Sequence, residues 1–275
     1  MRLFLVRHGE TVDNVAGLYA GVRDSPLTTH GVLQARRLAS HLASRSSSIG
    51  PVTHIFSSDL RRAVSTAQAI VDAQVIKVTD KEDTDHPKLQ LVQVVELRER
   101  DFRSAEGKRF GTPHPDAETH DEMRARATDF VQVHLGPVLD GIFSSDKCKT
   151  NTSVVVVAHG LILNSLLRSL LARYAPEEMR RLTSAKLSSG SVAGRSEFLA
   201  AWSNTGYLEM KVDAIPSSEE TGKSIVRLNV VRVNALDHLH GLKRTRGGIG
   251  SAKFDSKQKT MDSFFKPAAK KRRAD

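Results

Sequence analysis

Two histidines of this sequence each follow a short apolar run and precede a glycine. They occur in the stretches Arg7-His8-Gly9 and His159-Gly160. A neutral imidazole is a competent nucleophile near pH 7 and also a hydrogen-bond donor. The neighbouring Arg7 supplies a planar, permanently charged guanidinium, and Gly9 allows the backbone to approach a ligand closely. This combination predicts nucleophilic chemistry on an anionic substrate.

Both histidines are preceded by stretches with the composition of buried strands. The apolar runs Arg2 to Val6 and Val154 to Ala158 each end in a polar loop that begins with the histidine block. In open α/β folds, ligands bind outside the carboxyl ends of parallel strands. We therefore expect both imidazoles at the carboxyl edge of one parallel sheet.

Strand and helix patterns alternate along the rest of the chain. Further strands are predicted over residues 52–56, 91–95, 198–202, 207–212 and 225–233, and helices over 31–44, from 60 onwards, 116–133 and 161–171. This alternation predicts an α/β fold, a three-layer helix-sheet-helix sandwich with a mostly parallel central sheet. Residues 175–197 have the character of an irregular insertion.

Several blocks of residues follow one another in a characteristic order. They are Arg7 to Thr11 with Asn14, Ser25 to Thr28 with Gly31 and Gln34-Ala35, Ser57 to Ala63 with Thr66-Ala67, Glu96 to Glu99 with Phe102 and Glu106-Gly107, and Ala158 to Gly160. Together they resemble the signature of the histidine phosphatase (phosphoglycerate mutase-like) superfamily. One Arg-His-Gly match arises by chance, but five blocks in the correct order are specific. The similarity covers residues 2 to about 165 and continues more loosely to Asn204.

The resemblance implies a role for each matched residue. A phosphomonoester carries about two negative charges, so its cleavage requires a nucleophile, stabilisation of the phosphoryl oxygens and a proton for the leaving group. In the family pattern, His8 attacks phosphorus to form a phosphohistidine, without a metal or other cofactor. The phosphoryl oxygens would be held by a set of donor and backbone positions: Arg7, Asn14, Gly21, Arg62 and His159.

The proton donor implied by the family is Glu99, and neighbouring Glu96 and Asp101 are alternatives if the loop is shifted. The chain departs from the family at Arg103, where glycine is common, and at Ala105, where an aromatic residue is common. Because these positions lie near the expected pocket wall, the substrate is left open between a phosphorylated small molecule and a phosphoprotein. The basic insertions of the mutases find no match here, which favours an acid-phosphatase-type phosphomonoesterase over a phosphoglycerate-type mutase.

Positive charge is concentrated at the C-terminal end of the chain. The formal net charge is +10, and eleven of the 41 Lys and Arg residues lie within 243–275 beside three Asp. Because this stretch has little apolar surface to bury, we expect a phosphatase domain over 1–241 and a disordered basic tail over 242–275. The single Cys148 excludes an internal disulfide. Neither a membrane-spanning apolar run nor a signal peptide is found, so we expect an intracellular protein without membrane contact.

The tail contains two short motifs. Residues 258–265 match the pattern of a PIP-box, the peptide that docks on the PCNA-type sliding clamp, through Gln258, Met261, Phe264 and Phe265. One turn of 3₁₀-like helix would place the three apolar side chains on one side as a hydrophobic plug. Residues 270–273 resemble a nuclear localisation signal, read by an import receptor, through Lys270, Lys271, Arg272 and Arg273.

These motifs predict that the protein is located in the nucleus, with the cytoplasm as a second location, and that it makes no direct sequence-specific contact with nucleic acid. The alternative is a non-catalytic clamp-binding adaptor on a phosphatase fold. A relic of that kind is expected to have lost one or more of the matched site residues, and His8, Arg7, Arg62 and His159 are all present. The sequence therefore favours the enzyme.

Overall fold

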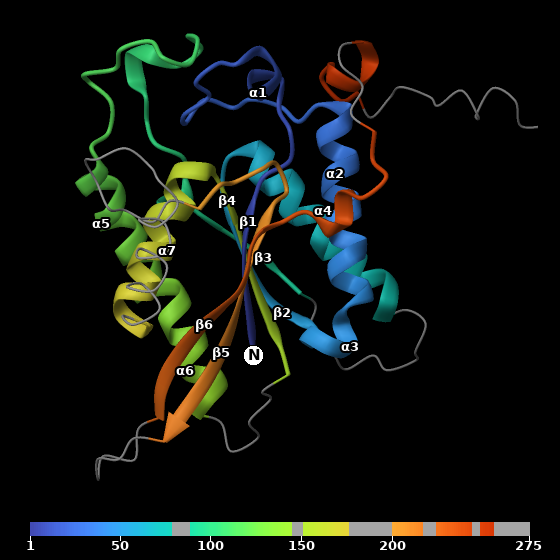
Figure 1. Ribbon diagram of the computed structural model, residues 1–275, viewed down its shortest axis with the longest axis vertical. Coiled ribbons are helices and arrows are strands. Elements are labelled where there is room, and N and C mark those ends of the chain that lie inside the picture. The colour runs from blue at the N-terminus through green and yellow to red at the C-terminus, as the bar shows by residue number, and fades with distance from the viewer. Residues whose placement is uncertain (79–88, 145–150, 176–199, 217–223, 244–247, 256–275) are drawn as a thin grey trace, which may run out of the picture.

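Strands and helices alternate along the computed structural model (Figure 1), which describes residues 1–78, 89–144, 151–175, 200–216, 224–243 and 248–255. The strands are β1 (Arg2–Arg7), β2 (Val52–Ser58), β3 (Leu91–Val94), β4 (Ser153–Ala158), β5 (Tyr207–Pro216) and β6 (Ser224–Ala235). The helices are α1 (Val12–Ala16), α2 (Thr29–Ser44), α3 (Ser46–Ile49), α4 (Arg61–Val78), α5 (His120–Phe130), α6 (Gly136–Ser144) and α7 (Gly160–Tyr174).

The strands form one sheet in the order β3-β2-β4-β1-β5-β6. Strands β3, β2, β4 and β1 are parallel to their neighbours, whereas β5 and β6 are added antiparallel at one side. The expected mixed α/β architecture with a mostly parallel sheet is confirmed. Strands β1 and β4 are adjacent, and their register pairs Arg7 with Ala158. The residues that follow this pair, His8 and His159, therefore leave the sheet side by side.

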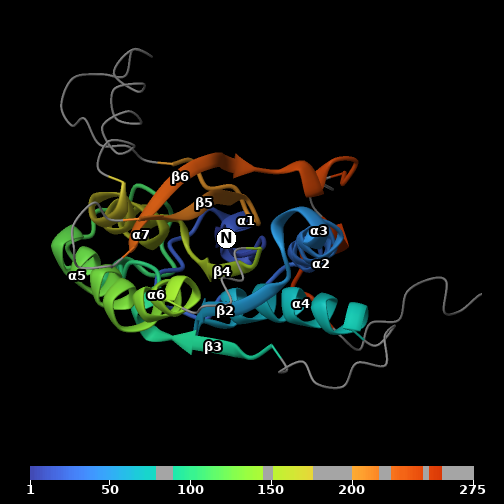
Figure 2. The same cartoon turned by 90° about the horizontal axis from the view of Figure 1, so that it is seen from below.

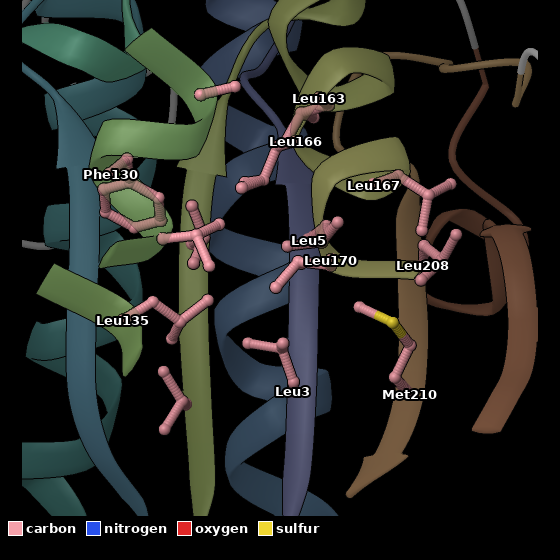
Figure 3. Packing of buried hydrophobic residues seen from close by; sticks show 14 of the residues in the cluster. Leu3, Leu5, Phe130, Leu135, Leu163, Leu166, Leu167, Leu170, Leu208 and Met210 are labelled. Carbon is pink, nitrogen blue, oxygen red and sulfur yellow. The ribbon is translucent and has the colours of Figure 1, made fainter. Parts of the chain in front are cut away.

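Helices cover both faces of the sheet (Figures 1 and 2), with α5, α6 and α7 on one face and α2, α3 and α4 on the other. Successive residues of a strand point to opposite faces, so β1 places Leu3 and Leu5 in the cluster under α7, shown in Figure 3, and Phe4 and Val6 in the cluster under α2 and α4. All six residues of β4 are buried. Burial on both faces explains its unbroken run of valines.

Two predicted elements differ from the structure. The helix predicted over 116–133 begins only at His120, because Thr119 and Glu122 form a reciprocal capping box at its start. The predicted strand over 198–202 is wrong for the residues described there, since Ala200 to Trp202 are irregular. The Ala200 amide and the Trp202 indole Nε1 both donate to Asn164 Oδ1 of α7, so this segment is bound to a helix rather than to the sheet.

Part of the chain beyond the predicted domain boundary packs on α2. The Phe254 amide donates to Leu27 O at 3.1 Å, and the Thr29 amide donates to Ala252 O at 3.1 Å. The PIP-box match (258–265), the nuclear signal (270–273), Cys148 and all but the first residue of the predicted insertion (175–197) lie outside the described residues. Within the described part of the chain, every helix is too short or too polar to cross a membrane.

Candidate active site

His8 and His159 lie together at the carboxyl edge of β1 and β4, on the side of the sheet from which α1 projects in Figure 1. Their ring centroids are 5.0 Å apart, and the His8 amide donates to Ala158 O at 3.0 Å. His8 is 3% exposed and His159 is 0% exposed. The structure thus brings the two predicted histidines into one buried site.

The hydrogen bond made by His8 fixes its tautomer. Its Nδ1 lies 2.7 Å from the carbonyl oxygen of Gly9. A carbonyl oxygen only accepts hydrogen bonds, so Nδ1 carries the proton and Nε2 keeps a lone pair. The ring nitrogen that a nucleophile requires is therefore Nε2.

His159 has the opposite tautomer because of Arg62. The Arg62 Nε–H donates to His159 Nδ1 at 3.2 Å, which leaves the imidazole proton on Nε2. That Nε2 is buried and has no hydrogen-bond partner among the described residues. Buried donors are almost always paired, so this one is suited to an acceptor that arrives with a ligand.

Arg62 is 1% exposed and is held from three sides. Besides its bond to His159, it donates to Gly21 O at 2.6 Å and to Arg23 O at 2.7 Å. Burial lowers the pKa of Arg62 to about 10, opposed by the charge of Glu99. The guanidinium is therefore charged at neutral pH and fixed in direction.

Arg7 supplies a second unpaired donor in the site. One of its terminal nitrogens donates to Trp202 O at 2.6 Å, while its Nε is buried with no partner among the described residues. Burial lowers the pKa of Arg7, and the charge of Glu99 opposes this. The donors of Arg7 and His159 are arranged to receive an anion.

Both imidazoles are neutral at physiological pH. Burial lowers the pKa of His8 well below its usual range, and the charges of Arg62 and Arg7 lower it further. Burial likewise lowers the pKa of His159, followed by the effect of Arg62. A neutral His8 keeps the Nε2 lone pair available.

A turn between Trp202 and β5 closes the site from the antiparallel side of the sheet. The Asn204 side chain donates to His8 O at 3.2 Å and to Asn14 Oδ1 at 3.0 Å. The Thr205 amide donates to the carbonyl oxygens of Arg7 and His8, and Thr205 has φ +56°, which is strained for a β-branched residue. Neither residue is predicted as a site residue from the sequence, although Ser203-Asn204-Thr205-Gly206 is a turn signal.

Asn14 lies at the edge of this site, at the start of α1. Its Oδ1 accepts from Asn204 and from the Thr11 amide at 3.2 Å. Because this oxygen accepts both bonds, the side-chain NH₂ group of Asn14 is left as the donor. Contact of this donor with a phosphoryl oxygen stays a prediction.

The Glu99 side chain lies at the amino end of α7, the helix that begins directly after His159. Its carboxylate accepts from the amides of Leu161 and Ile162 at 3.2 Å each and from Arg100 at 3.0 Å. Amide groups at a helix start are unpaired within the helix and favour an anion. The influence of Glu99 on the pKa of both Arg7 and Arg62 places its charge in the site.

Of the three acids, Glu99 alone accepts from the amides at the start of α7 within the described residues. Asp101 accepts from the Arg103 amide at 2.7 Å. Glu96 belongs to the 3₁₀ turn Val95–Leu97 and lines a pocket of about 450 Å³ together with Asp101 and Glu99. The geometry thus favours Glu99 among the three.

Arg103 stands where the family often has glycine, and its backbone adopts a conformation that favours glycine. Arg103 has φ +45°, a left-handed conformation that costs a residue with a Cβ about 1–2 kcal/mol. A hydrogen bond from the Arg103 amide to the Asp101 carboxylate stabilises this turn. The departure from the family pattern therefore places an arginine where the backbone conformation favours glycine.

Gly21 contacts the site through Arg62. It has φ +53°, and a Cβ placed on it would lie 2.0 Å from Glu106 Oε1. That oxygen accepts from the Val22 amide at 2.7 Å, and burial raises the pKa of Glu106. Gly21 and Glu106 thus hold the carbonyl that orients Arg62, whereas the sequence predicted direct phosphate contact for Gly21.

Gly21→Ala is expected to destabilise the domain by about 1–2 kcal/mol through backbone strain and to weaken the binding of inorganic phosphate, because displacing Glu106 releases the Gly21 carbonyl from Arg62. Thermal unfolding and phosphate titration calorimetry measure the two effects. Gly241→Ala is the control, since Gly241 has φ +73° but nothing within 4 Å of its added Cβ. Equal phosphate affinity in both variants would contradict this role of Gly21.

No group of three or more His, Cys, Asp and Glu side chains is placed to bind a metal ion within the described ranges. The arrangement instead combines buried cations, neutral imidazoles and unpaired donors. Such donors stabilise an anion. The site is therefore suited to an anionic group.

Known proteins share this sequence pattern. The family model described as "Histidine phosphatase superfamily (branch 1)" matches residues 3–205. A "Probable phosphatase" of Schizosaccharomyces pombe is 31% identical over 272 residues, which covers 94% of this chain and 78% of the relative. The "Probable phosphoglycerate mutase GpmB" of Yersinia pestis is 30% identical over 198 residues, covering 68% of this chain and 83% of the relative.

The solved structures show the same fold. The mycobacterial glucosyl-3-phosphoglycerate phosphatase in complex with VO3 superposes with a TM-score of 0.57 at 20% identity, over 86% of this chain and 99% of that one. The matched family region contains Arg7, His8, Arg62, Glu99 and His159, which the fold gathers into one site. On this basis the chain belongs to the histidine phosphatase superfamily, branch 1.

Proposed function

We propose that this protein is a phosphomonoester hydrolase that works through a phosphohistidine on Nε2 of His8. The observation that carries the proposal is the pair of buried, unpartnered donors, His159 Nε2 and Arg7 Nε, beside a neutral imidazole. A dianionic phosphoryl group satisfies such donors, and its phosphorus then faces the nucleophile.

The reaction divides into two balanced steps. The first step starts from the protonated form of Glu99: His8 Nε2 forms a bond to phosphorus while the bond to the leaving-group oxygen breaks, and that oxygen takes the proton of the Glu99 carboxyl group. In the second, a water oxygen attacks phosphorus, Glu99 takes the proton of the water, and the N–P bond breaks to release phosphate. Arg7, Arg62, Asn14 and His159 hold the three remaining phosphoryl oxygens throughout.

A phosphoglycerate-type mutase is the second candidate, because relatives carry both phosphatase and mutase names. The two reactions differ only in the acceptor of the phosphoryl group. Supplying 3-phosphoglycerate with a bisphosphate primer and following both products by ³¹P NMR separates them. We expect free phosphate as the product; transfer between the 2- and 3-positions without phosphate release would select the mutase.

We further propose that the tail tethers the enzyme to a PCNA-type sliding clamp in the nucleus. Support comes from the sequence match at all four defined positions, followed by a basic cluster. A tether of this kind raises the local concentration of enzyme at the clamp without a new contact in the active site. The same motifs would serve a non-catalytic clamp-binding adaptor, which an active enzyme excludes.

Phe264→Ala/Phe265→Ala is expected to abolish capture of the protein by immobilised clamp, because the two aromatic rings are the anchors of the motif. Pull-down with purified clamp measures this. A matched control is Lys270→Ala/Lys271→Ala, which leaves the docking residues intact and is expected to bind the clamp as wild type does while losing nuclear accumulation. Undiminished capture of the double phenylalanine variant would refute the clamp proposal.

A further inference from the structure

Arg126 of α5 lies beneath the turn that carries Glu99. One of its terminal nitrogens donates to Glu96 O at 2.7 Å and to Arg98 O at 2.6 Å, and the other donates to Glu99 O at 3.1 Å. One guanidinium thus donates hydrogen bonds to three carbonyl oxygens within the four residues 96–99. Glu96 lies in the 3₁₀ turn Val95–Leu97, and Arg98 and Glu99 lie in the loop after it, so these carbonyls are beyond the paired residues of β3.

Glu118 holds the guanidinium in this position. Its carboxylate accepts from Arg126 Nε at 2.6 Å and from a terminal nitrogen at 2.8 Å, a bidentate pair. The same carboxylate accepts from the Asp101 amide at 3.1 Å, and Glu118 O accepts from Arg100 Nε at 2.7 Å. Both side chains are largely buried, at 20% and 12% exposure. The pair therefore fixes the loop on both sides of Glu99.

The position of the Glu99 carboxylate depends on this loop. The carboxylate accepts from the amides of Leu161 and Ile162 at the start of α7. These hydrogen bonds require the main chain of Glu99 to lie close to that end of the helix. The charge of Arg126 also lowers the pKa of His159, so the guanidinium lies within electrostatic reach of the site. Misplacement of a catalytic group by about 1 Å can cost on the order of 10²-fold in rate.

We infer that Arg126, clamped by Glu118, is the positioning residue for the general acid Glu99. This inference rests on the proposed function, and no role in phosphoryl binding is assigned to Arg126. Lysine cannot replace it, because a point charge on a flexible stem offers no planar fork for the carboxylate and three carbonyls together. The expected signature is therefore a loss of leaving-group protonation with nucleophilic attack preserved.

The test compares two substrates that differ in their need for an acid. Glycerol phosphate has a poor alkoxide leaving group, whereas p-nitrophenyl phosphate releases a stabilised phenolate that requires little protonation. Glu99→Gln is expected to lower kcat for glycerol phosphate by on the order of 10²–10⁴-fold, and Arg126→Gln and Arg126→Lys by on the order of 10²-fold. For p-nitrophenyl phosphate we expect a much smaller loss in all three variants.

Arg124→Gln is the matched control, because Arg124 is on the same helix but 65% exposed in an ion pair with Asp121; it is expected to keep wild-type rates on both substrates. Thermal unfolding checks that the Arg126 variants are folded. An equal loss on both substrates, or none, would overturn the inference while leaving the proposed function intact. If wild type releases no phosphate from either substrate, the proposed function itself fails.

Discussion

His8→Ala is expected to abolish phosphate release, with a loss in kcat of at least about 10⁴-fold. Without the nucleophile the covalent intermediate cannot form. No other described side chain combines a neutral nucleophilic nitrogen with contact to this site: the Nδ1 of His159 accepts from Arg62 and its Nε2 carries the proton. Hydrolysis of p-nitrophenyl phosphate measures the loss. Trapping radiolabelled phosphate on the protein, as an acid-labile adduct, shows whether the intermediate forms.

His8→Asn provides a second variant, since its amide can still donate to the Gly9 carbonyl that the His8 Nδ1 engages. It is expected to stay folded and to bind phosphate while remaining inactive. His120→Ala, at an exposed position of α5, is the histidine control and should keep full activity. An active His8→Asn, or an adduct formed on His8→Ala, would exclude the proposed mechanism.

Acidification from pH 7 to pH 5 is expected to destabilise the domain strongly. Burial lowers the pKa of His8, His159 and His238 in the folded state, the last to about 4. An unfolded histidine has a pKa of about 6.5, so below that pH the unfolded chain binds more protons and stability falls with falling pH. His238, with its folded pKa of about 4, then contributes a loss of about 2 kcal/mol by pH 5, and His8 and His159 add losses of the same sign.

Losses of this size are a large fraction of a typical total stability of about 5–15 kcal/mol. Glu106 acts in the opposite direction, since its raised pKa makes the folded state bind a proton more readily as the pH falls. Urea unfolding between pH 7 and pH 5 measures the slope. His159→Gln is expected to reduce the change of the unfolding free energy with pH by the contribution of one histidine. His120→Gln should leave this change as it is in wild type. A midpoint independent of pH over this window would contradict the burial of neutral histidines.

We propose that the substrate is selected by side chains outside the phosphoryl site. Arg103 extends from a strained turn where the family commonly has glycine, and its side chain is 57% exposed. Ala105 is fully buried beside Phe102 in a small separate cluster, so it supports this turn from the inside. A screen of phosphorylated metabolites and phosphopeptides tests which substrate is used.

Local sequence was sufficient to predict the elements that carry the nucleophile. The uninterrupted apolar composition of β1 and β4 requires burial on both faces, and burial on both faces predicts central parallel strands. The order of the matched blocks gave the family and the residues Arg7, His8, Arg62 and His159. It also gave Glu99 as the first of three acids, which the geometry at the start of α7 favours.

Other features depend on contacts between distant parts of the chain. The predicted strand ending at Trp202 is wrong because Asn164 captures its amide and indole groups, and apolar periodicity carries no information about such a partner. Asn204 reaches Asn14 across 190 positions. From the sequence, Arg126 is indistinguishable from the other charged residues of its helix. Only the folded structure shows the three carbonyl oxygens to which it donates.

The sequence alone determined the kind of chemistry, because a histidine beside an arginine in this motif order is typical of phosphoryl transfer. The clamp-binding and nuclear roles proposed for the tail also rest on the sequence alone. Tertiary structure decided the protonation of the two histidines and the direction of the acid. The physical reason is that a tautomer is set by the partner of the other ring nitrogen. For His159 that partner is Arg62, 97 positions away and visible only once the chain is folded.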